Sequence, residues 1–150
     1  MSQSLVKNHL HIVFGTKNKE CNIVPEIETE LYKYIAGIGR KLACPAQIIN
    51  GHKNHVHVLC LLSQNIALSK LIQRLKGSSS RWIKQRFQNF DHFYWQNGYG
   101  AFSVSPHEID KVVKYIKNQK QHHLKTSYEN EYLHFLKKNK IEFDENYIWD

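Results

Sequence analysis

The sequence predicts an α+β fold in which a largely antiparallel sheet of about five strands carries helices on both faces. Apolar and polar residues alternate over residues 7–14, and residues 54–62 contain a short apolar run, as expected for strands. Apolar residues recur at helical spacing over residues 26–41 and again from Ile109 onward. The 150 residues are enough for one hydrophobic core and too few for two comfortable ones, so residues 1–150 should form a single domain.

The first strand, residues 7–14, is expected to have one apolar face and one face with two histidines, because side chains alternate along a strand. The two faces are Leu10, Ile12 and Phe14 against His9, His11 and Val13. A basic loop with Lys17 and Lys19 comes next. Pro25 then opens an amphipathic helix over residues 26–41, since proline suits the first turn of a helix.

Two further strands are expected after that helix, over residues 43–50 and 54–62, with turn residues between them. The second contains Asn54-His55-Val56-His57, in which both imidazoles point to the same side while Val56 points into the core. This geometry can present two imidazoles to one metal ion. Taken alone, however, a His-x-His pair is more often the solvated face of a half-buried strand.

The middle of the chain is predicted to contain a basic helix followed by a hairpin. Helical spacing runs over residues 66–87 with an interruption or kink at residues 77–80, and its second half interleaves basic with aromatic side chains. Two aromatic segments, residues 93–96 and 99–105, flank Asn97-Gly98, which is a strong hairpin signal. Two more antiparallel strands should follow from it.

The best-defined helix start is Ser105-Pro106-His107-Glu108, a capping box with proline at the first helical position. The helix is expected to bury a stripe of four aliphatic residues, Ile109, Val112, Val113 and Ile116. Tyr115 and Gln119 lie one turn apart along one flank of that stripe. A tyrosine in such a position is usually a boundary residue with a solvated hydroxyl.

The C-terminal tail, residues 126–150, is expected to pack against protein. It holds three of the 21 Lys and Arg and six of the 13 Asp and Glu, so its net charge is −3 and that of residues 1–125 is +11. A helix is predicted from Tyr128 to about Lys138, and an exposed end carrying Trp149 would be costly. We therefore expect the tail to dock on its own domain or on a partner chain.

The composition favours a polyanion as partner. The net charge is +8 and aromatic residues make up 12% of the chain, a combination that suits contacts with phosphates and stacking on bases. The three cysteines, Cys21, Cys44 and Cys60, show no close pairing, which indicates free thiols in a reducing compartment. Neither a secretion signal nor an apolar run of membrane-spanning length is present, so we expect a cytoplasmic protein that binds no membrane.

Together these features resemble the HUH single-tyrosine transposases, the TnpA-type enzymes of the insertion sequence 200/605 family. The order strand, helix, strand, strand, helix, strand is that of a ferredoxin-like or RRM-like sheet. The landmarks that match the family follow its order and cover most of the chain: His11, Lys17, Asn54-His55-Val56-His57, Trp95 to Ser105, and Tyr115-Ile116-Lys117-Asn118-Gln119.

The resemblance implies roles for four residues. Tyr115 matches the family's catalytic nucleophile, while His55, His57 and Gln119 match three protein ligands of a divalent metal, Mg²⁺ or Mn²⁺. The family's enzymes cleave single-stranded DNA beside hairpins at the ends of the insertion element. They form a 5′-phosphotyrosine, rejoin strands and work as homodimers. The resemblance leaves open whether Tyr115 acts in its own chain or completes the site of the partner chain. The resemblance thus implies a homodimeric transposase acting on single-stranded DNA with hairpins.

Two further groups of residues have weaker assignments. Those expected to contact DNA phosphates are Lys17, Lys19, Arg74 and Arg81. His9 and His11 form a second His-x-His motif, and the first and third strands are neighbours in a ferredoxin-like sheet. We therefore expect these two histidines to support the metal ligands or to contact DNA.

Two alternatives stay open. A related HUH nickase, such as a relaxase, a replication initiator or a domesticated repeat-associated transposase, would use a similar site, although the small size weighs against the first two. A non-catalytic module for single-stranded DNA or RNA would use the same sheet, basic surface and aromatic residues. Binding alone, however, does not require the set of His55, His57, Tyr115 and Gln119.

Overall fold

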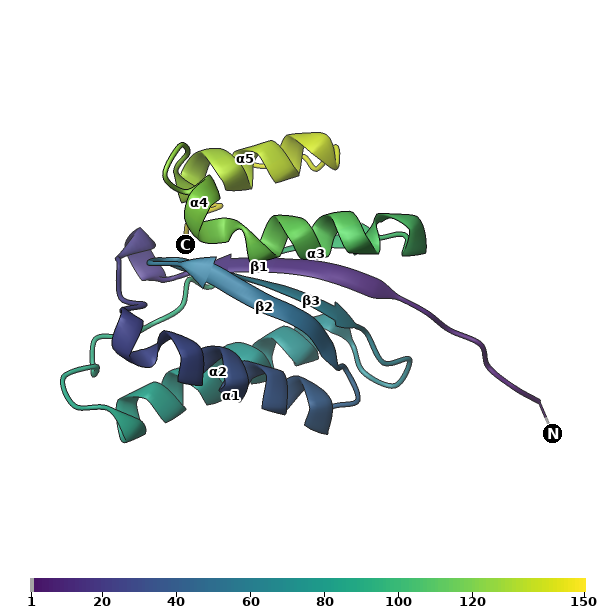
Figure 1. Ribbon diagram of the computed structural model, residues 1–150, viewed down its shortest axis with the longest axis horizontal. Helices are drawn as coiled ribbons and strands as arrows, with labels where there is room; N and C mark the ends of the chain where they lie inside the picture. The colour runs from purple at the N-terminus through teal and green to yellow at the C-terminus, as the bar shows by residue number, and fades with distance from the viewer. Residues whose placement is uncertain (1) are drawn as a thin grey trace.

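The computed structural model describes residues 2–150 and shows a four-stranded sheet with helices on both faces (Figure 1). The strands are β1 (His9–Gly15), β2 (Ala46–His52), β3 (His55–Leu61) and β4 (Gly100–Val104). They lie in the order β2-β3-β1-β4, and every neighbouring pair is antiparallel. The predicted α+β class with an antiparallel sheet is confirmed, with four strands in place of about five.

The helices form two layers that enclose the sheet (Figure 1). On one face lie α1 (Pro25–Lys41) and α2 (Leu68–Arg86). On the other face lie α3 (Ile109–Lys117), α4 (Gln119–His122) and α5 (Tyr128–Lys138). Two short 3₁₀ turns, Lys17–Lys19 and Pro106–Glu108, complete the regular structure of the described residues. Within residues 2–150, none of the helices combines the length and the apolar character that crossing a membrane requires.

The alternation of side chains along β1 and β3 separates an apolar layer from a polar one. Ile12 and Phe14 of β1 and Val58 of β3 point toward α1 and α2, where they join the main hydrophobic core. The residues between them in sequence face α3, α4 and α5, so both histidines of β3 are buried beneath these helices. The main core thereby supports the polar layer from the opposite face of the sheet.

The predicted hairpin at Asn97-Gly98 is wrong. Trp95 forms an antiparallel bridge with Thr16, and β4 begins where Gly100 lies opposite Val13 of β1. Both predicted strands therefore run in one direction along the same edge of β1, which accounts for the smaller number of strands. Gly98 does not adopt the positive φ that a type I′ hairpin turn requires.

A lysine from α2 explains why the hairpin signal fails. The ammonium group of Lys76 donates hydrogen bonds to the carbonyls of Gln96 at 2.8 Å, Asn97 at 3.1 Å and Gly98 at 2.5 Å. Three consecutive backbone acceptors are thus satisfied by one side chain, and this segment needs no partner strand of its own. The segment bulges out of the edge of the sheet instead of turning back.

The predicted interruption of the basic helix is also wrong, because α2 continues from Leu68 to Arg86. The small residues in its middle allow close packing rather than breaking the helix. Ser79 is fully buried, and its hydroxyl accepts a hydrogen bond of 3.0 Å from the indole nitrogen of Trp95. This bond joins α2 to the chain segment that bridges to Thr16.

The residues after α5 fold back over its surface. Ile148 and Trp149 pack against an aromatic cluster that includes Tyr128 and Tyr132 of α5. The carbonyl of Ile148 accepts a hydrogen bond of 3.1 Å from the side-chain amide of Gln96. The end of the chain is thereby attached both to α5 and to the segment that precedes β4.

Candidate active site and metal centre

A cluster of buried polar side chains lies between the sheet and the layer formed by α3, α4 and α5. His55 and His57 of β3 and Gln119 of α4 are each 0% exposed, and Glu131 of α5 is 3% exposed. Burial of this many polar groups is costly unless they bind one another or a ligand. The cluster is therefore the strongest candidate for a functional site.

The two histidines of β3 point to the same side because one residue separates them in the strand. Nε2 of His55 lies 2.9 Å from Oε1 of Gln119, and Nε2 of His57 lies 2.9 Å from Oε1 of Glu131. The centroids of the two imidazole rings are 5.2 Å apart. Both Nε2 atoms therefore face the same small volume beneath α4 and α5.

Tyr115 reaches this volume from the last turn of α3. A 3₁₀ turn occupies the predicted start of the helix at Pro106–Glu108, and α3 begins at Ile109. The Ser105 hydroxyl makes no capping bond within the described residues. The helix ends where the side-chain amide of Asn50 donates to the carbonyls of Ile116 at 3.0 Å and Lys117 at 3.2 Å. These bonds satisfy terminal carbonyls of α3 and fix the end of the helix on β2. Tyr115 is thereby held over the sheet.

The hydroxyl of Tyr115 makes two contacts within the site. It donates a hydrogen bond to Oε2 of Glu131 and lies 3.2 Å from Nε2 of His122. Gln119, one turn further along the chain, donates from Nε2 to the same Oε2 atom at 2.9 Å. Tyr115 and Gln119 thus converge on one carboxylate oxygen.

The sequence did not identify two residues of the site, Glu131 and His123. Oε1 of Glu131 lies 2.9 Å from Nε2 of His57 and 3.3 Å from Nε2 of both His55 and His123. The one sequence signal for Glu131 was its position between Tyr128 and Phe135 on the inward face of a predicted helix, where an apolar residue is expected. His123 lies just after α4 in a stretch without a clear periodicity.

Burial determines the protonation of this cluster. It lowers the pKa of His55 to about 4, so the imidazole is neutral at pH 7. Burial also raises the pKa of Tyr115, and the charge of Glu131 raises it further, so the phenol stays protonated. Burial alone would raise the pKa of Glu131, but His57 and the hydrogen bonds of the other histidines outweigh it and hold that pKa well below its usual range.

The donor atoms of the cluster fit a divalent cation. Ligand atoms of His55, His57, His123 and Glu131 all lie within 4.8 Å of one another. Imidazole nitrogen and carboxylate oxygen are common ligands of Mn²⁺, Zn²⁺ and related ions, with bonds of about 2.0–2.2 Å. The amide oxygen of Gln119, 2.9 Å from Nε2 of both His55 and His123, faces the same point.

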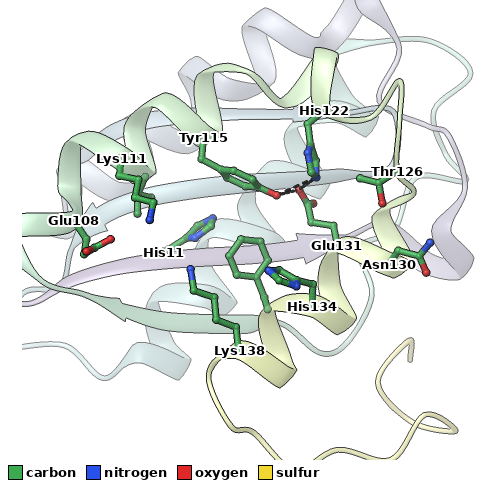
Figure 2. Close-up of a pocket in the computed structure, with 12 residues that line it drawn as sticks. His11, Glu108, Lys111, Tyr115, His122, Thr126, Asn130, Glu131, His134 and Lys138 are labelled. Carbon is green, nitrogen blue, oxygen red and sulfur yellow. Dashed lines mark hydrogen bonds and ion pairs between the residues drawn. The ribbon is translucent and has the colours of Figure 1, made fainter.

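A cavity of about 530 Å³, lined by two lysines and two glutamates among other residues, leads to the cluster from between α3 and α5. Figure 2 shows Lys111 of α3 and Lys138 of α5 reaching toward it from opposite sides, with Tyr115 and Glu131 at its inner end. Two ammonium groups on the way to the half-buried hydroxyl of Tyr115 can bind a phosphodiester and hold it near that oxygen.

The two histidines of β1 lie at different distances from the cluster. Nε2 of His11 lies 2.7 Å from Nδ1 of His57, so His11 directly contacts a residue of the site. His9 pairs with Leu61, at the opposite end of β3 from His55. Within residues 2–150, Nδ1 of His9 is buried and has no hydrogen-bond partner.

The four basic residues expected to contact DNA lie away from the cluster. Lys17 and Lys19 follow β1, and their ammonium groups lie 5.7 Å from the ring centroid of Tyr94 and 4.6 Å from that of Trp149, respectively. Arg74 and Arg81 are exposed on α2, in the helical layer on the other face of the sheet from the histidines of β3. The structure therefore brings together the histidines of β3, Gln119 and Tyr115, but not these basic residues.

Comparison with known proteins identifies related sequences and folds. A family model described as "Transposase IS200 like" matches residues 4–119, a span that ends before His123 and Glu131. A search of curated protein sequences gave no match.

Two solved structures share the fold. One is a crystal structure from Deinococcus radiodurans R1, provisionally described as a transposase, with 21% identity and a TM-score of 0.63 over 79% of this chain and 98% of that chain. The other is a REP-associated tyrosine transposase bound to a REP hairpin, with 15% identity and a TM-score of 0.61 over 82% of this chain and 74% of that chain.

Proposed function

The chain belongs to the IS200-like family of transposases, and from this premise we propose that it cleaves and rejoins single-stranded DNA through a covalent link to Tyr115. The observation that carries the proposal is the convergence of Tyr115, Gln119 and the two histidines of β3 on one buried volume at the end of a cavity that two lysines line. A module that only binds nucleic acid has no need of a half-buried tyrosine hydroxyl beside two buried imidazoles.

The proposed reaction uses the contacts of Tyr115. Its hydroxyl oxygen attacks the scissile phosphorus and forms a 5′-phosphotyrosine, while the bond from phosphorus to the 3′ oxygen breaks and leaves a 3′-hydroxyl. Glu131 holds the hydroxyl in place but is a poor base, because its pKa is held well below its usual range. The phenolic proton has a better acceptor in the imidazole of His122, whose Nε2 lies 3.2 Å away, and the leaving 3′ oxygen takes up a proton. Lys111 and Lys138 would bind the DNA backbone at the entrance of the cavity. Because the phosphotyrosine conserves the phosphodiester energy, rejoining needs no external energy source.

The proposed metal centre uses His55, His57 and Gln119 as ligands of Mg²⁺ or Mn²⁺. When bound, the ion would neutralise charge on the scissile phosphate and stabilise the tyrosine phenolate. Deprotonation of a free tyrosine at pH 7 costs roughly 4 kcal/mol. A neighbouring cation can offset part of this cost. The chain's own contribution is to hold both imidazoles and the amide in place beside Tyr115.

The proposed substrate is single-stranded DNA with a hairpin at the end of an insertion element. A REP-associated transposase of the same fold is bound to a REP hairpin, which supports this substrate class. Lys17 and Lys84 both lie against the ring of Tyr94, with Lys84 at 3.6 Å, and form a surface suited to phosphate contact and base stacking. Arg74 and Arg81, two turns apart on α2, would extend the phosphate contacts.

We further propose a homodimer, as the family resemblance implies. Tyr115 and Gln119 both donate hydrogen bonds to Glu131 of their own chain, which supports a site formed from one chain. The proposed compartment is the cytoplasm, where Cys21, Cys44 and Cys60, all free thiols in the structure, would stay reduced.

The proposed function is tested with a labelled hairpin oligonucleotide in single-stranded form and annealed to its complement, each with Mg²⁺, with Mn²⁺ or with EDTA. We expect cleavage of the single strand only, a free 3′-hydroxyl on one product, and no cleavage in EDTA. Tight binding with no metal-dependent cleavage under any of these conditions would contradict the proposal and favour a non-catalytic binding module.

A further inference from the structure

We propose that Glu131 and His123 are additional ligands of the metal centre, so that α5 and the segment after α4 supply a carboxylate and a third imidazole. This inference rests on the proposed function and deepens it, because the ion would then be held by more than His55, His57 and Gln119. Glu131 and His123 both lie beyond the span 4–119 that the family model matches.

The first argument is the position of the proton on His55. The amide nitrogen of Asn54 donates to the carbonyl of Lys19 at 3.2 Å, which turns the amide oxygen toward Nδ1 of His55 at 3.0 Å. Nδ1 of the neutral ring therefore carries the proton. The Nε2 lone pair then faces two oxygen atoms, Oε1 of Gln119 at 2.9 Å and Oε1 of Glu131 at 3.3 Å.

His123 repeats this arrangement from the other side. Its Nδ1 lies 2.9 Å from the carbonyl of Thr126, an acceptor that fixes the proton on Nδ1 of the neutral ring. Its Nε2 lone pair also faces Oε1 of Gln119 at 2.9 Å and Oε1 of Glu131 at 3.3 Å. Such an Nδ1–H bond to a carbonyl is the usual way in which a metal-binding histidine is oriented.

The amide of Gln119 cannot supply the missing proton. Its Nε2 already donates to Oε2 of Glu131 at 2.9 Å, so its oxygen is the atom that faces the imidazoles. With His55 and His123 both neutral, two nitrogen lone pairs converge with the oxygen atoms of Gln119 and Glu131, and no hydrogen atom lies between them. In the metal-free protein a proton on Nε2 of His123 can occupy this place. A cation at their centre satisfies all four acceptors.

The distances fit this interpretation. Oε1 of Glu131 is 2.9 Å from Nε2 of His57 and 3.3 Å from Nε2 of His55 and of His123. Two ligands with bonds of about 2.1 Å are about 3.0 Å apart at adjacent octahedral positions and about 3.4 Å apart at tetrahedral ones. The carboxylate is therefore already at ligand separation from all three imidazoles.

The two carboxylate oxygens of Glu131 contact different groups in this arrangement. Oε1 faces the imidazoles, and Oε2 accepts hydrogen bonds from Gln119 and Tyr115. One side chain from α5 thus holds the tyrosine hydroxyl next to the ion. Three imidazoles with one carboxylate favour Mn²⁺, Co²⁺ or Zn²⁺ over Mg²⁺, because Mg²⁺ prefers oxygen ligands.

The test is a titration of the whole chain with Co²⁺. Calorimetry measures the affinity, and the visible absorption of bound Co²⁺ reports its coordination. The variant is Glu131→Gln, and the matched control is Glu129→Gln, which removes the same charge from the same helix outside the cluster. We expect one Co²⁺ per chain in the wild type and the control with equal affinity. In Glu131→Gln we expect about 100-fold weaker binding and a changed spectrum.

The outcomes separate this inference from the proposed metal centre. Equal affinity and an unchanged spectrum in Glu131→Gln, with binding lost in His57→Ala, would overturn the role of Glu131 and leave the metal centre intact. A wild-type protein that binds no Co²⁺ would overturn both. If Glu131→Gln does not fold, the anomalous signal of Mn²⁺ in wild-type crystals decides the matter. An ion within about 2.3 Å of a Glu131 oxygen is expected, and an ion bound by His55, His57 and Gln119 alone would overturn the inference.

Discussion

The hydroxyl of Tyr115 donates a hydrogen bond to the carboxylate of Glu131, and this contact ties α3 to α5 across the buried cluster. The partner carboxylate also lies against three imidazoles, so the tyrosine is fixed relative to both histidines of β3. Burial and the charge of Glu131 both raise the pKa of Tyr115. The free protein therefore holds this hydroxyl in its protonated form.

The histidines of β1 and β3 should differ sharply in their importance for cleavage. We expect His57→Ala to abolish cleavage of hairpin DNA, because it removes a proposed metal ligand. His11→Ala should reduce cleavage about 10- to 100-fold, since Nε2 of His11 orients His57 through a contact of 2.7 Å. His9→Ala should weaken it least, because His9 lies at the far end of the strand pair. Single-turnover cleavage rates test this order, and an equal loss in all three variants would contradict it.

The metal-free protein should lose stability as the pH falls from 7 toward 4. Burial lowers the pKa of His55 to about 4, below its unfolded value of about 6.5. The unfolded chain therefore binds a proton in this window that the folded chain does not bind, and the stabilisation present above pH 6.5 is lost on acidification. The difference corresponds to about 3 kcal/mol.

Urea unfolding in EDTA at pH 7, 5.5 and 4 measures this loss. His123 acts in the opposite direction: burial would lower its pKa, but the hydrogen bond to Glu131 raises it, so its contribution is present below pH 6.5 and is lost above. The pH dependence should be smaller in His55→Asn than in the wild type. An unfolding free energy that is flat or rises on acidification would contradict the assignment of a buried neutral His55.

Gly15 should be required for the packing around His55. A Cβ atom at this position would lie 2.7 Å from Cε2 of Tyr128 and 3.0 Å from Oε1 of Gln96. The ring of Tyr128 stacks on His55 with centroids 4.4 Å apart, so a displaced tyrosine would disturb the site. We expect Gly15→Ala to lower the free energy of unfolding by about 1–3 kcal/mol.

The matched control is Gly77→Ala on α2, where a Cβ atom would meet nothing within 4 Å. Because alanine favours a helix more than glycine does, this substitution should stabilise the protein by up to about 1 kcal/mol. Chemical unfolding of both variants tests the pair, and a Gly15→Ala protein as stable as Gly77→Ala would show that the close approach at Gly15 does not matter.

The two basic pairs should each bind DNA phosphates. We expect the double substitutions Lys17→Ala/Lys19→Ala and Arg74→Ala/Arg81→Ala to weaken binding of single-stranded DNA. Each should reduce the slope of log affinity against log salt by about 1.4, or roughly 0.7 per lost contact. Lys33→Ala/Lys41→Ala, which removes the same charge from exposed positions of α1, is the control. If the loss of a pair changes the slope no more than the control substitution changes it, that pair does not contact phosphate.

Local patterns predicted much of the fold because they depend on neighbours in sequence. Strand alternation placed the histidines of β3 on one side, and helical periodicity placed α5 at Tyr128–Lys138, the bounds it has in the structure. The predicted hairpin at Asn97-Gly98 does not form. Lys76, about twenty residues earlier in the chain, binds the three backbone carbonyls of this segment instead.

The composition of the site was only partly accessible from the sequence for the same reason. Tyr115 and Gln119 are four residues apart on one flank of the predicted helix, so their relation is local, although the structure ends α3 at Lys117 and starts α4 at Gln119. Glu131 reaches His57 only because α5 folds back over the sheet, and the two residues are 74 positions apart. No periodicity within α5 reports on such a contact, beyond the presence of an acid on its inward face.

The most direct measurement is the mapping of the covalent DNA adduct. Wild type, Tyr115→Phe and Tyr147→Phe, which alters a 70% exposed tyrosine, are incubated with hairpin-bearing single-stranded DNA and Mn²⁺ and then digested for mass spectrometry. We expect a phosphotyrosine-linked nucleotide on the peptide that contains Tyr115 in the wild type and in Tyr147→Phe, and no adduct in Tyr115→Phe. An undiminished adduct in Tyr115→Phe, or an adduct on another residue of the wild type, would contradict the assignment of Tyr115 as the nucleophile.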